Sequence, residues 1–318
     1  MHERIGTGER MFSTIIVVGS VNMDLVVRTK RMPKEGESLI GSGFTMVPGG
    51  KGANQAVAAA RLGGTTHFVG RVGNDMFGTR LREGLSSCGV TTEHLLVDDG
   101  PSGIAVIILN ESGQNSIVVA PGANATCRPD DLRPVAALFG MADFLLLQLE
   151  IPLKTIEAAL DMAHAAGLRS VLDAGPAQEV SMDLLRKADI VSPNETEASA
   201  LTGIEVNNLT TARKAAKKLL DGGVETVVIK LGQQGALVVT PDLEEHVSSF
   251  PVDAVDTTAA GDAFTGALAV ALADGTDLVD AVRFANAAGA LAVTCLGAQP
   301  SMPTRESVEQ FIAERVGS

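Results

Sequence analysis

The segment FLLLQLEIPLKTIEAALDMAHAAGLRSVLD, residues 144–173, contains the pattern that decides the fold. Its apolar start, residues 144–149, predicts a buried strand, and the periodic stretch 153–166 predicts a helix. A second apolar run at 170–173 predicts the next strand. Because a helix between two strands lets the strands run parallel in one sheet, the segment predicts a β-α-β unit.

The same alternation of strand and helix continues in both directions along the chain. Further strands are predicted at 13–19, 66–72, 116–119, 190–191, 226–231, 236–240 and 246–249. Helices are predicted at 54–62, 76–87, 129–138, 182–187, 195–201, 211–220, 259–273, 278–294 and 305–313. This order predicts an α/β fold, in which helices flank both faces of a mostly parallel sheet.

Two β-rich stretches lack helices that could cover them. Residues 21–47 and 94–110 are rich in β-branched residues and are partly polar. They predict a small separate sheet that is inserted in two parts and forms a lid. We expect residues 1–318 to form a single α/β domain that carries this lid, with residues 1–10 as an extension.

The composition excludes several classes of protein. The 318 residues are 45% apolar, which allows a sizeable core and excludes a disordered chain. The net charge of −13 and the absence of Tyr and Trp argue against a nucleic-acid partner. Cys88, Cys127 and Cys295 lie far apart, so we expect no disulfide framework, no zinc site and a cytoplasmic location. No apolar run approaches the ~20 residues of a membrane span, so no membrane partner is expected.

Common cofactor and hydrolase motifs are missing from the sequence. There is no G-x-G-x-x-G dinucleotide fingerprint, and Gly50-Lys51 is followed by Gly52 rather than by the Ser or Thr of a Walker A loop. H-E-x-x-H and G-x-S-x-G are absent as well. Dinucleotide, P-loop, zincin and hydrolase functions therefore lose their sequence support.

The segment DTTAAGDAF, residues 256–264, is a candidate site for phosphoryl transfer. Its small residues let a ligand approach the free amides at a helix start, where the helix dipole favours an anion. Asp262 would repel that anion, which makes sense if it takes a proton from a hydroxyl that attacks phosphorus. The alternative is that Asp262 only complements the helix dipole.

Other polar groups follow predicted strands or open predicted helices. The segment PGGKGANQ, residues 48–55, suits a ligand with several hydroxyls, although a glycine-rich turn with a solvated lysine explains it equally well. Asn22 and Asp24 follow the first strand, where α/β sheets bind ligands, or they form an ordinary turn. Glu150 ends another buried strand, or is simply an acidic residue before a helix.

Two further segments each have a structural alternative. Asn194 precedes a predicted helix with acids in its first turn, and a helix cap explains it better than a ligand does. Residues 231–235 contain two glycines between predicted strands, which indicate a hairpin turn or a surface beneath a nucleotide.

Two of these segments resemble the paired signatures of the ribokinase/PfkB family of carbohydrate kinases. They are GGKGAN at 49–54 and DTTAAGD at 256–262, and both are specific when they occur together in this order. The resemblance covers nearly the whole chain. It includes VGSVNMD (18–24), LQLE (147–150), PNETEA (193–198) and GAQPS (297–301).

The resemblance implies an ATP-dependent sugar kinase, closest to the branch that phosphorylates D-ribose at its 5-hydroxyl. It implies that the sugar binds to Asn22, Asp24, Gly50, Lys51, Asn54 and Glu150. Asp262 is implied to be the base, and the phosphoryl group is implied to be held by the amides of Ala259, Ala260 and Gly261. ATP is implied to lie around Asn194, Lys230, Leu231, Gly232, Gln233, Gln234, Gly235, Gly261 and Asn286.

The resemblance also implies metal ions and a partner. The family uses ATP with Mg²⁺, and a monovalent cation, K⁺, is implied to bind mostly to backbone carbonyls of one loop. Its members here are Asp256, Thr258, Ala292, Cys295, Gly297 and Ser301. The branch usually forms homodimers in which two lid sheets pack together.

Three alternatives remain. One is a kinase of the same family that acts on 2-deoxyribose, a hexose or a nucleoside, and deoxyribose is the hardest to exclude because it differs by one hydroxyl. A second is a sugar-binding regulator that has lost catalysis. Such a protein should have lost the base or the anion-binding turn, but Asp262 and the turn Ala259-Ala260-Gly261 (the anion turn) are both present. A third is a dehydrogenase, against which the missing dinucleotide fingerprint argues.

Overall fold

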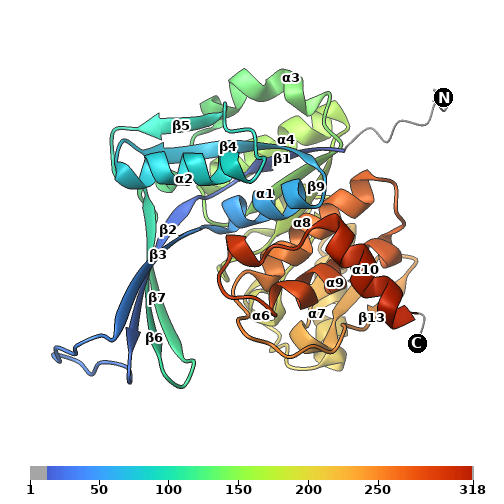
Figure 1. The fold of residues 1–318 in the computed structure, drawn as a ribbon. Helices are drawn as coiled ribbons and strands as arrows, with labels where there is room; N and C mark the ends of the chain where they lie inside the picture. Colours follow the sequence, from blue (N-terminus) through green and yellow to red (C-terminus); the bar gives the residue numbers. More distant parts are fainter. Residues whose placement is uncertain (1–12, 317–318) are drawn as a thin grey trace.

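A computed structural model describes residues 13–316, so the extension expected at 1–10 lies outside the described residues. The strands of its main sheet are β1 (Thr14–Val18), β4 (Thr65–Gly73), β5 (Leu95–Asp98), β8 (Phe144–Gln148), β9 (Arg169–Asp173), β10 (Ile190–Val191), β11 (Thr226–Lys230), β12 (Ala236–Val239) and β13 (Glu244–Val247). Their order is β13-β12-β11-β10-β9-β8-β1-β4-β5 (Figure 1). From β11 to β5 every pairing is parallel, and only β12 and β13 are added antiparallel at one edge of this sheet. The predicted α/β class is confirmed.

The continuous apolar runs form strands that are buried on both faces. In β1, Ile15 and Val17 belong to one hydrophobic core, whereas Ile16 and Val18 belong to the other. All four side chains are 0% exposed. Because successive side chains point to opposite faces, a strand between two helical layers has to be apolar throughout, which is why an uninterrupted run predicts it.

Helices cover both faces of the main sheet (Figure 1). One layer, which shares one core, contains α1 (Lys51–Arg61), α2 (Met76–Ser87), α8 (Ala260–Ala273), α9 (Leu278–Ala292) and α10 (Arg305–Val316). The other layer contains α3 (Ala136–Phe139), α4 (Leu153–Ala166), α5 (Met182–Leu185), α6 (Glu195–Thr202) and α7 (Leu209–Asp221). The predicted arrangement of helices on both faces is therefore confirmed.

Helices α1 and α8 approach each other closely at Gly266. A Cβ atom at Gly266 would lie 2.7 Å from the Ala58 Cβ and 2.9 Å from the Gln55 backbone oxygen, so only glycine fits there. This contact brings the N-terminal turns of α1 and α8 together, and these turns carry the candidate site.

The helix predicted at 129–138 is largely a 3₁₀ turn, Pro129–Val135, followed by the short α3. Pro134 lies inside that turn, and proline cannot donate the backbone hydrogen bond that an α-helix needs. Among residues 13–316, none of the helices combines the length and the apolar character that crossing a bilayer requires.

The small separate sheet projects from one side of the main domain (Figure 1). Its strands are β2 (Asn22–Thr29), β3 (Gly43–Gly49), β6 (Gly103–Asn110) and β7 (Asn115–Ala120), in the order β3-β2-β6-β7. The bounds predicted for the second part of this small sheet, 94–110, are wrong at both ends. Strand β5 pairs with β4 in the main sheet, whereas β7, which we expected among the main strands, pairs with β6. The short connection 111–114 makes β6 and β7 a hairpin, and hairpin strands stay in one sheet.

Candidate functional site

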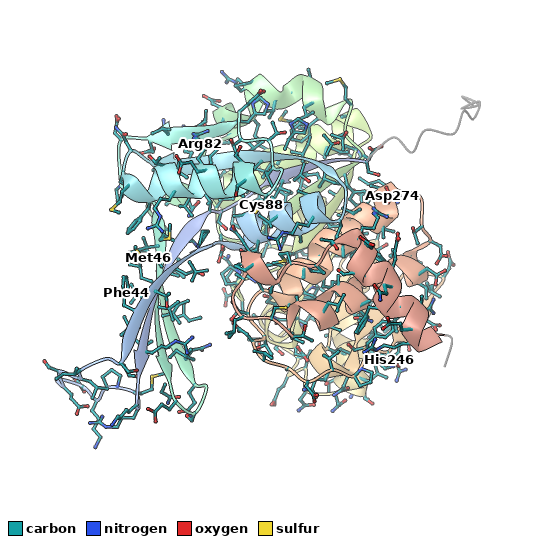
Figure 2. All side chains as sticks on the ribbon, viewed as in Figure 1. Phe44, Met46, Arg82, Cys88, His246 and Asp274 are labelled. Carbon is teal, nitrogen blue, oxygen red and sulfur yellow. The ribbon has the colours of Figure 1, made fainter. Side chains whose placement is uncertain are left out.

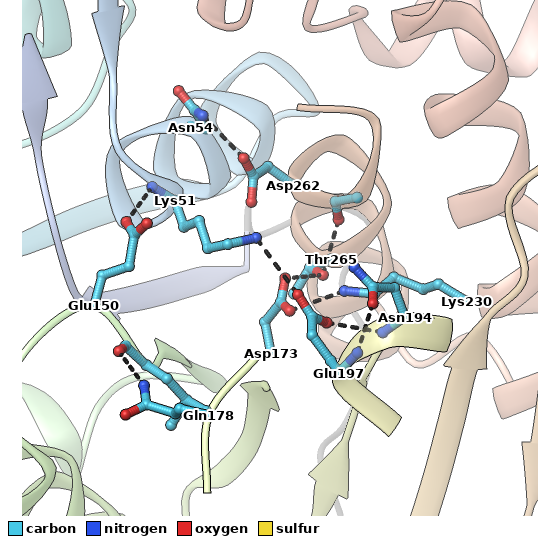
Figure 3. A network of polar contacts seen from close by, with 12 residues as sticks. Lys51, Asn54, Glu150, Asp173, Gln178, Asn194, Glu197, Lys230, Asp262 and Thr265 are labelled. Carbon is cyan, nitrogen blue, oxygen red and sulfur yellow. Dashed lines mark hydrogen bonds and ion pairs between the residues drawn. The ribbon is translucent and has the colours of Figure 1, made fainter. Parts of the chain in front are cut away.

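Polar side chains from several elements meet at the carboxyl ends of the central strands (Figure 3). Glu150 follows β8, and Asp173 ends β9. Lys51 and Asn54 lie in the first turn of α1, and Asp262 lies in the first turn of α8. Two strand ends and two helix starts therefore face one another, at the edge where α/β sheets bind ligands.

Asp262 lies in the middle of this cluster. It is 5% exposed, and its two carboxylate oxygens accept hydrogen bonds from Asn54 Nδ2 at 2.9 Å and Gln55 Nε2 at 3.2 Å. Burial raises the pKa of Asp262 to about 6, while Lys51 opposes that rise and Asp173 adds to it. The carboxylate is therefore mostly ionised at neutral pH but close to its titration range, as a general base should be.

Lys51 supplies a positive charge next to Asp262. Four carboxylates act on it, those of Asp262, Asp173, Glu197 and Glu150. Burial disfavours the charged form of Lys51, but the carboxylates outweigh burial and hold its pKa above the usual range. Its Nζ lies 3.8 Å from Glu197 Oε1, and its backbone amide donates to Glu150 Oε2 at 3.0 Å. Lys51 thus stays charged and ties the start of α1 to the end of β8.

Asn22 and Gly50 lie side by side at the start of α1. Asn22 Oδ1 accepts a hydrogen bond from Asn124 Nδ2 at 2.7 Å, which fixes the orientation of the Asn22 carboxamide. Gly50 is the N-cap residue of α1 and has a φ of 91°. A Cβ atom there would lie 2.8 Å from the Asn22 backbone nitrogen, so glycine is required both by φ and by this close approach.

Asp24 enters the site from β2 of the small sheet. It lies against Gly49, where a Cβ atom would come within 2.3 Å of Asp24 Oδ2. Burial, and then the charges of Glu150 and Asp262, raise the pKa of Asp24 to about 7. The small sheet therefore brings a carboxylate close to Glu150 and Asp262, where the hydroxyl groups of a ligand can donate hydrogen bonds to the carboxylates.

Helix α8 starts at a strained turn. Its N-cap residue, Ala259, has a φ of 60°, in the left-handed region that favours glycine. Its side chain cannot cap the helix, and among the described residues no side chain caps the amides of Ala260 and Gly261; the Ala260 amide makes only a long bond of 3.4 Å to the Thr257 carbonyl. Uncapped amides at a helix start attract an anion, and strain of this kind is typical of functional turns.

A pocket of about 710 Å³ lies beside the same turn. Seven of the predicted nucleotide residues line it: Asn194, Lys230, Gly232, Gln233, Gly235, Gly261 and Asn286. Phe264, the last residue of the segment 256–264, also lines it, as do residues 249–252, which no sequence motif indicated. The volume fits a small-molecule ligand. Gly261 therefore belongs both to the anion turn and to the pocket.

Two predicted nucleotide residues lie outside this lining. Leu231 is buried in the hydrophobic core, and the backbone oxygen of Gln234 accepts a hydrogen bond from His246 Nε2 at 2.7 Å. Between them the chain forms a 3₁₀ turn, Gly232–Gln234. Successive residues of such a turn face different directions, so only part of the run reaches the pocket.

Asn194 and Asn286 both stabilise the backbone around the pocket. Asn194 caps α6: its Oδ1 accepts from the Glu197 amide at 2.9 Å, and Glu197 Oε2 accepts from the Asn194 amide at 2.8 Å. The capping alternative for Asn194 is therefore confirmed. Asn286 Nδ2 donates to the Val247 backbone oxygen at 2.9 Å, which ties α9 to the end of β13.

The residues of the expected cation loop lie in two neighbouring segments. Asp256 Oδ2 accepts from the Gly297 amide at 2.9 Å, and Asp256 Oδ1 accepts from the Thr258 amide at 2.9 Å. Ala292 ends α9 and its carbonyl accepts from the Cys295 amide at 3.2 Å, whereas the Ser301 hydroxyl donates to the Ala298 carbonyl. The donor set of carbonyls and one carboxylate fits a hard cation.

Sequence reasoning missed several residues that organise the site. Gln55, Asp173, Thr265 and Gln148 form a buried hydrogen-bond network behind Asp262, and Asn124 holds Asn22. For Asp173 a signal was present, because it ends a predicted buried strand in the same way as Glu150. Gln55 and Gln148 lie inside the quoted segments 48–55 and 147–150, but no role was assigned to either, because a glutamine in a helix or strand is ordinary.

Known proteins match this chain over nearly its whole length. The sequence model for "pfkB family carbohydrate kinase" matches residues 13–305. The chain is 42% identical to a ribokinase of Haemophilus influenzae over 95% of this chain and 99% of that protein. It is 38% identical to a deoxyribokinase of Salmonella typhi over 94% of this chain and 98% of that protein.

A solved structure of Arabidopsis thaliana ribokinase complexed with ribose and ATP superimposes with a TM-score of 0.89. The two chains are 38% identical, and the match covers 95% of this chain and 99% of that one. Fold, signature segments and full-length identity agree, and this chain belongs to the pfkB family of carbohydrate kinases.

Proposed function

We propose that this protein transfers the γ-phosphoryl group of ATP to the 5-hydroxyl of D-ribose and releases D-ribose 5-phosphate and ADP. The observation that carries the proposal is the position of Asp262. Its buried carboxylate lies between the hydroxyl-binding cluster of Asp24 and Lys51 and the uncapped amides that border the pocket.

The sugar binds to Asn22, Asp24, Gly50, Lys51, Asn54 and Glu150. Asp262 takes the proton of the 5-hydroxyl as the oxygen attacks the γ-phosphorus; the new O–P bond forms while the bond to the β-phosphate oxygen breaks. The amides of Ala259, Ala260 and Gly261 stabilise the charge on the transferred group. This assignment is supported by the fact that base and amides belong to one helical turn.

Among acceptors, ribose has the broadest support. Relatives named ribokinase match this chain at 38% to 42% identity over nearly full length. A 2-deoxyribose kinase is the second candidate, favoured by the Salmonella typhi deoxyribokinase at 38% identity. Hexoses and nucleosides are weaker candidates.

ATP binds in the pocket around Lys230, Gly235 and Asn286, and Mg²⁺ arrives on its phosphates. Mg²⁺ keeps several waters and is held mainly by phosphates, so it does not require a cage of protein carboxylates. K⁺ is proposed to bind at the loop of Asp256 and Gly297, close to the start of α8. When bound there it stabilises the backbone of the anion turn.

The proposed reaction is tested by ADP release with Mg·ATP and a panel of acceptors: D-ribose, 2-deoxyribose, fructose, adenosine and no sugar. We expect turnover with ribose, faster in KCl than in an equal concentration of LiCl. Faster turnover with another acceptor would replace ribose as the proposed substrate, but the proposed kinase reaction would stand. No turnover with any acceptor, although the sugar binds, would favour the regulator and contradict the kinase proposal.

We also propose that two copies pair through their small sheets. Phe44, Val106 and Val118 are exposed on one face of this sheet, and Ile117 and Val119 on the other; Phe44 is labelled on the projecting sheet in Figure 2. An apolar surface of this kind is unusual on a monomer, and two equal patches can cover each other in a symmetric dimer.

The pairing predicts a monomer when a charge is placed on the contact face. Val118 is 69% exposed and Ile117 is 52% exposed, and their side chains point to opposite faces of β7. We expect the wild type to be dimeric in light scattering and Val118→Lys, which charges the face away from Asp24, to be monomeric. A monomeric wild type would contradict the pairing.

The three cysteines are free in the structure, which suits a reducing compartment. We place the enzyme in the cytoplasm on that basis.

A further inference from the structure

The carboxamide of Gln55 lies between two buried carboxylates. Gln55 Nε2 donates to Asp173 Oδ2 at 2.8 Å and to Asp262 Oδ1 at 3.2 Å. An amide nitrogen carries two hydrogens, so one group can serve both acceptors. Gln55 and Asp173 are fully buried, so neither side chain has access to solvent.

Gln148 fixes the orientation of the Gln55 carboxamide. Gln148 Nε2 donates to Gln55 Oε1 at 2.7 Å, which leaves the nitrogen of Gln55 facing the carboxylates. Gln148 itself is packed against Gly19 and Gly52, where Cβ atoms would lie 2.0 Å and 2.9 Å from its Oε1. In this arrangement the amide nitrogens of Gln55 and Gln148 each meet an acceptor, whereas Gln148 Oε1 has no hydrogen-bond partner among the described residues.

Asp173 is the anchor of this network. Its Oδ1 accepts from Lys230 Nζ at 2.9 Å, and its Oδ2 also accepts from Thr265 Oγ1 at 3.0 Å (Figure 3). The ammonium of Lys230 and these hydrogen bonds stabilise the charge of a fully buried carboxylate. Asp173 in turn holds Gln55 in place.

We propose that Gln55 is a positioning residue for phosphoryl transfer, which holds the Asp262 carboxylate in the orientation required of the base and is itself held by Asp173 and Gln148. The proposal rests on the proposed function, because it assumes that Asp262 receives the proton. It assigns Gln55 no contact with the sugar.

Removing the Gln55 donor should make Asp262 a weaker acid. The charged groups that act on Asp262 are Lys51 from α1 and Asp173 from β9, and Asp24 from β2 and Lys230 from β11 act on the same cluster. A hydrogen bond to the ionised form lowers a carboxyl pKa, and a neighbouring carboxylate raises it. Loss of Gln55 therefore raises the pKa of Asp262, whereas loss of the Asp173 charge lowers it.

The test is the titration of Asp262 in protein labelled with ¹³C at the aspartate carboxyl carbons, assigned with Asp262→Asn. Gln55→Met, a change of similar size, should raise the titration midpoint by about one pH unit. It should also lower kcat at neutral pH roughly 10-fold and leave the KM for the sugar within about twofold. Gln310→Met, the same change on the exposed side of α10, should leave the Asp262 midpoint, kcat and KM unchanged.

The Asp173 charge is tested with the double variant Asp173→Asn and Lys230→Met. The single Asp173→Asn change would leave the Lys230 ammonium without its partner, whereas the pair removes both charges together. Loss of the carboxylate lowers the Asp262 midpoint and loss of the ammonium raises it, so we expect a net shift well below that of Gln55→Met. A rise as large as that of Gln55→Met would contradict the assignment of that rise to the lost Gln55 donor. Lys230 lines the pocket, so this variant is read by titration alone.

A folded Gln55→Met protein whose Asp262 midpoint stays within about 0.2 pH unit of the wild type overturns the proposal, whatever its activity. If Gln55→Met does not fold, Gln148→Met takes its place, with a smaller upward shift expected and no shift overturning the proposal. The titration needs no substrate. Absence of turnover in the wild type would therefore contradict the proposed function separately and leave the titration result to decide the role of Gln55.

Discussion

Replacing Asp262 with alanine should lower kcat by roughly 10²–10⁴, while ribose and ADP still bind. The carboxylate is buried and held by Asn54 and Gln55, but the sugar and the nucleotide have other partners in the cluster and the pocket. Its loss removes the proton acceptor and leaves the anion turn in place. The measurement is steady-state ADP release together with calorimetric titration of both ligands.

The matched control for Asp262 is Asp280, which occupies the first turn of α9 and is exposed there. If Asp262 only complemented the helix dipole, Asp262→Ala and Asp280→Ala would have similarly small effects, of about 1 kcal/mol on stability. A normal turnover rate for Asp262→Ala would therefore remove it from the base role.

The pH dependence of kcat/KM follows from the pKa of Asp262 in the ligand-free protein, which burial raises to about 6. The base works only when it is ionised, so kcat/KM should be high above this pH and should fall about tenfold per unit below it. In Asp262→Asn the remaining activity should lack this acid limb. If Asp262→Asn shows the same fall in activity at acid pH, another group is responsible for that fall.

Replacing Asp24 with asparagine should weaken ribose binding by roughly 10²-fold and yet stabilise the sugar-free protein. A hydrogen bond to a charged group contributes about 1.5–3 kcal/mol, and a carboxylate at this position can accept from two neighbouring hydroxyls. Asparagine keeps the shape but replaces one acceptor by a donor. The measurement is calorimetric titration with ribose.

The gain in stability follows from the raised pKa of Asp24, about 7, for which burial is the main cause. The folded state keeps this proton to a higher pH than the unfolded state, whose aspartate has a pKa of about 3.9. The free energy of unfolding therefore falls as pH rises from about 4 to about 7, and the loss is complete above 7.

At pH 8, Asp24→Asn should recover about 4 kcal/mol in denaturant unfolding, and at pH 4 almost nothing. Asp99→Asn, at an exposed position of the chain, is the matched control and should change stability little at either pH. Equal stability of Asp24→Asn and the wild type at pH 8 would show that the carboxylate is not buried against its neighbours.

The pattern of apolar residues predicted most of the main domain, because burial on both faces leaves few alternatives. The runs that became β1, β8 and β9 could not be exposed without a large loss of hydrophobic free energy. The small sheet was harder. Strand β5 is short, and only its long-range pairing placed it beside β4, whereas β7 was expected in the main sheet although a short connection joins it to β6.

The sequence likewise predicted some residues of the candidate site and not others. Asp24, Glu150 and Asp262 could be selected because strand ends and helix starts are the places where α/β sheets bind ligands. Leu231 and Gln234 could not be separated from their neighbours, because the 3₁₀ turn at Gly232–Gln234 decides which of them reaches the pocket.

The amino-acid sequence by itself therefore determined the α/β class, the two signature segments and the positions of the acidic residues at strand ends and helix starts. These are local properties, set by side-chain periodicity and by the chemistry of helix termini. Only the tertiary structure decided that Gln55 lies between Asp173 and Asp262, which are 118 and 207 residues further along the chain. The reason is that an ordinary glutamine becomes decisive only when the close contact of α1 and α8 removes water and leaves it as the donor that both carboxylates share.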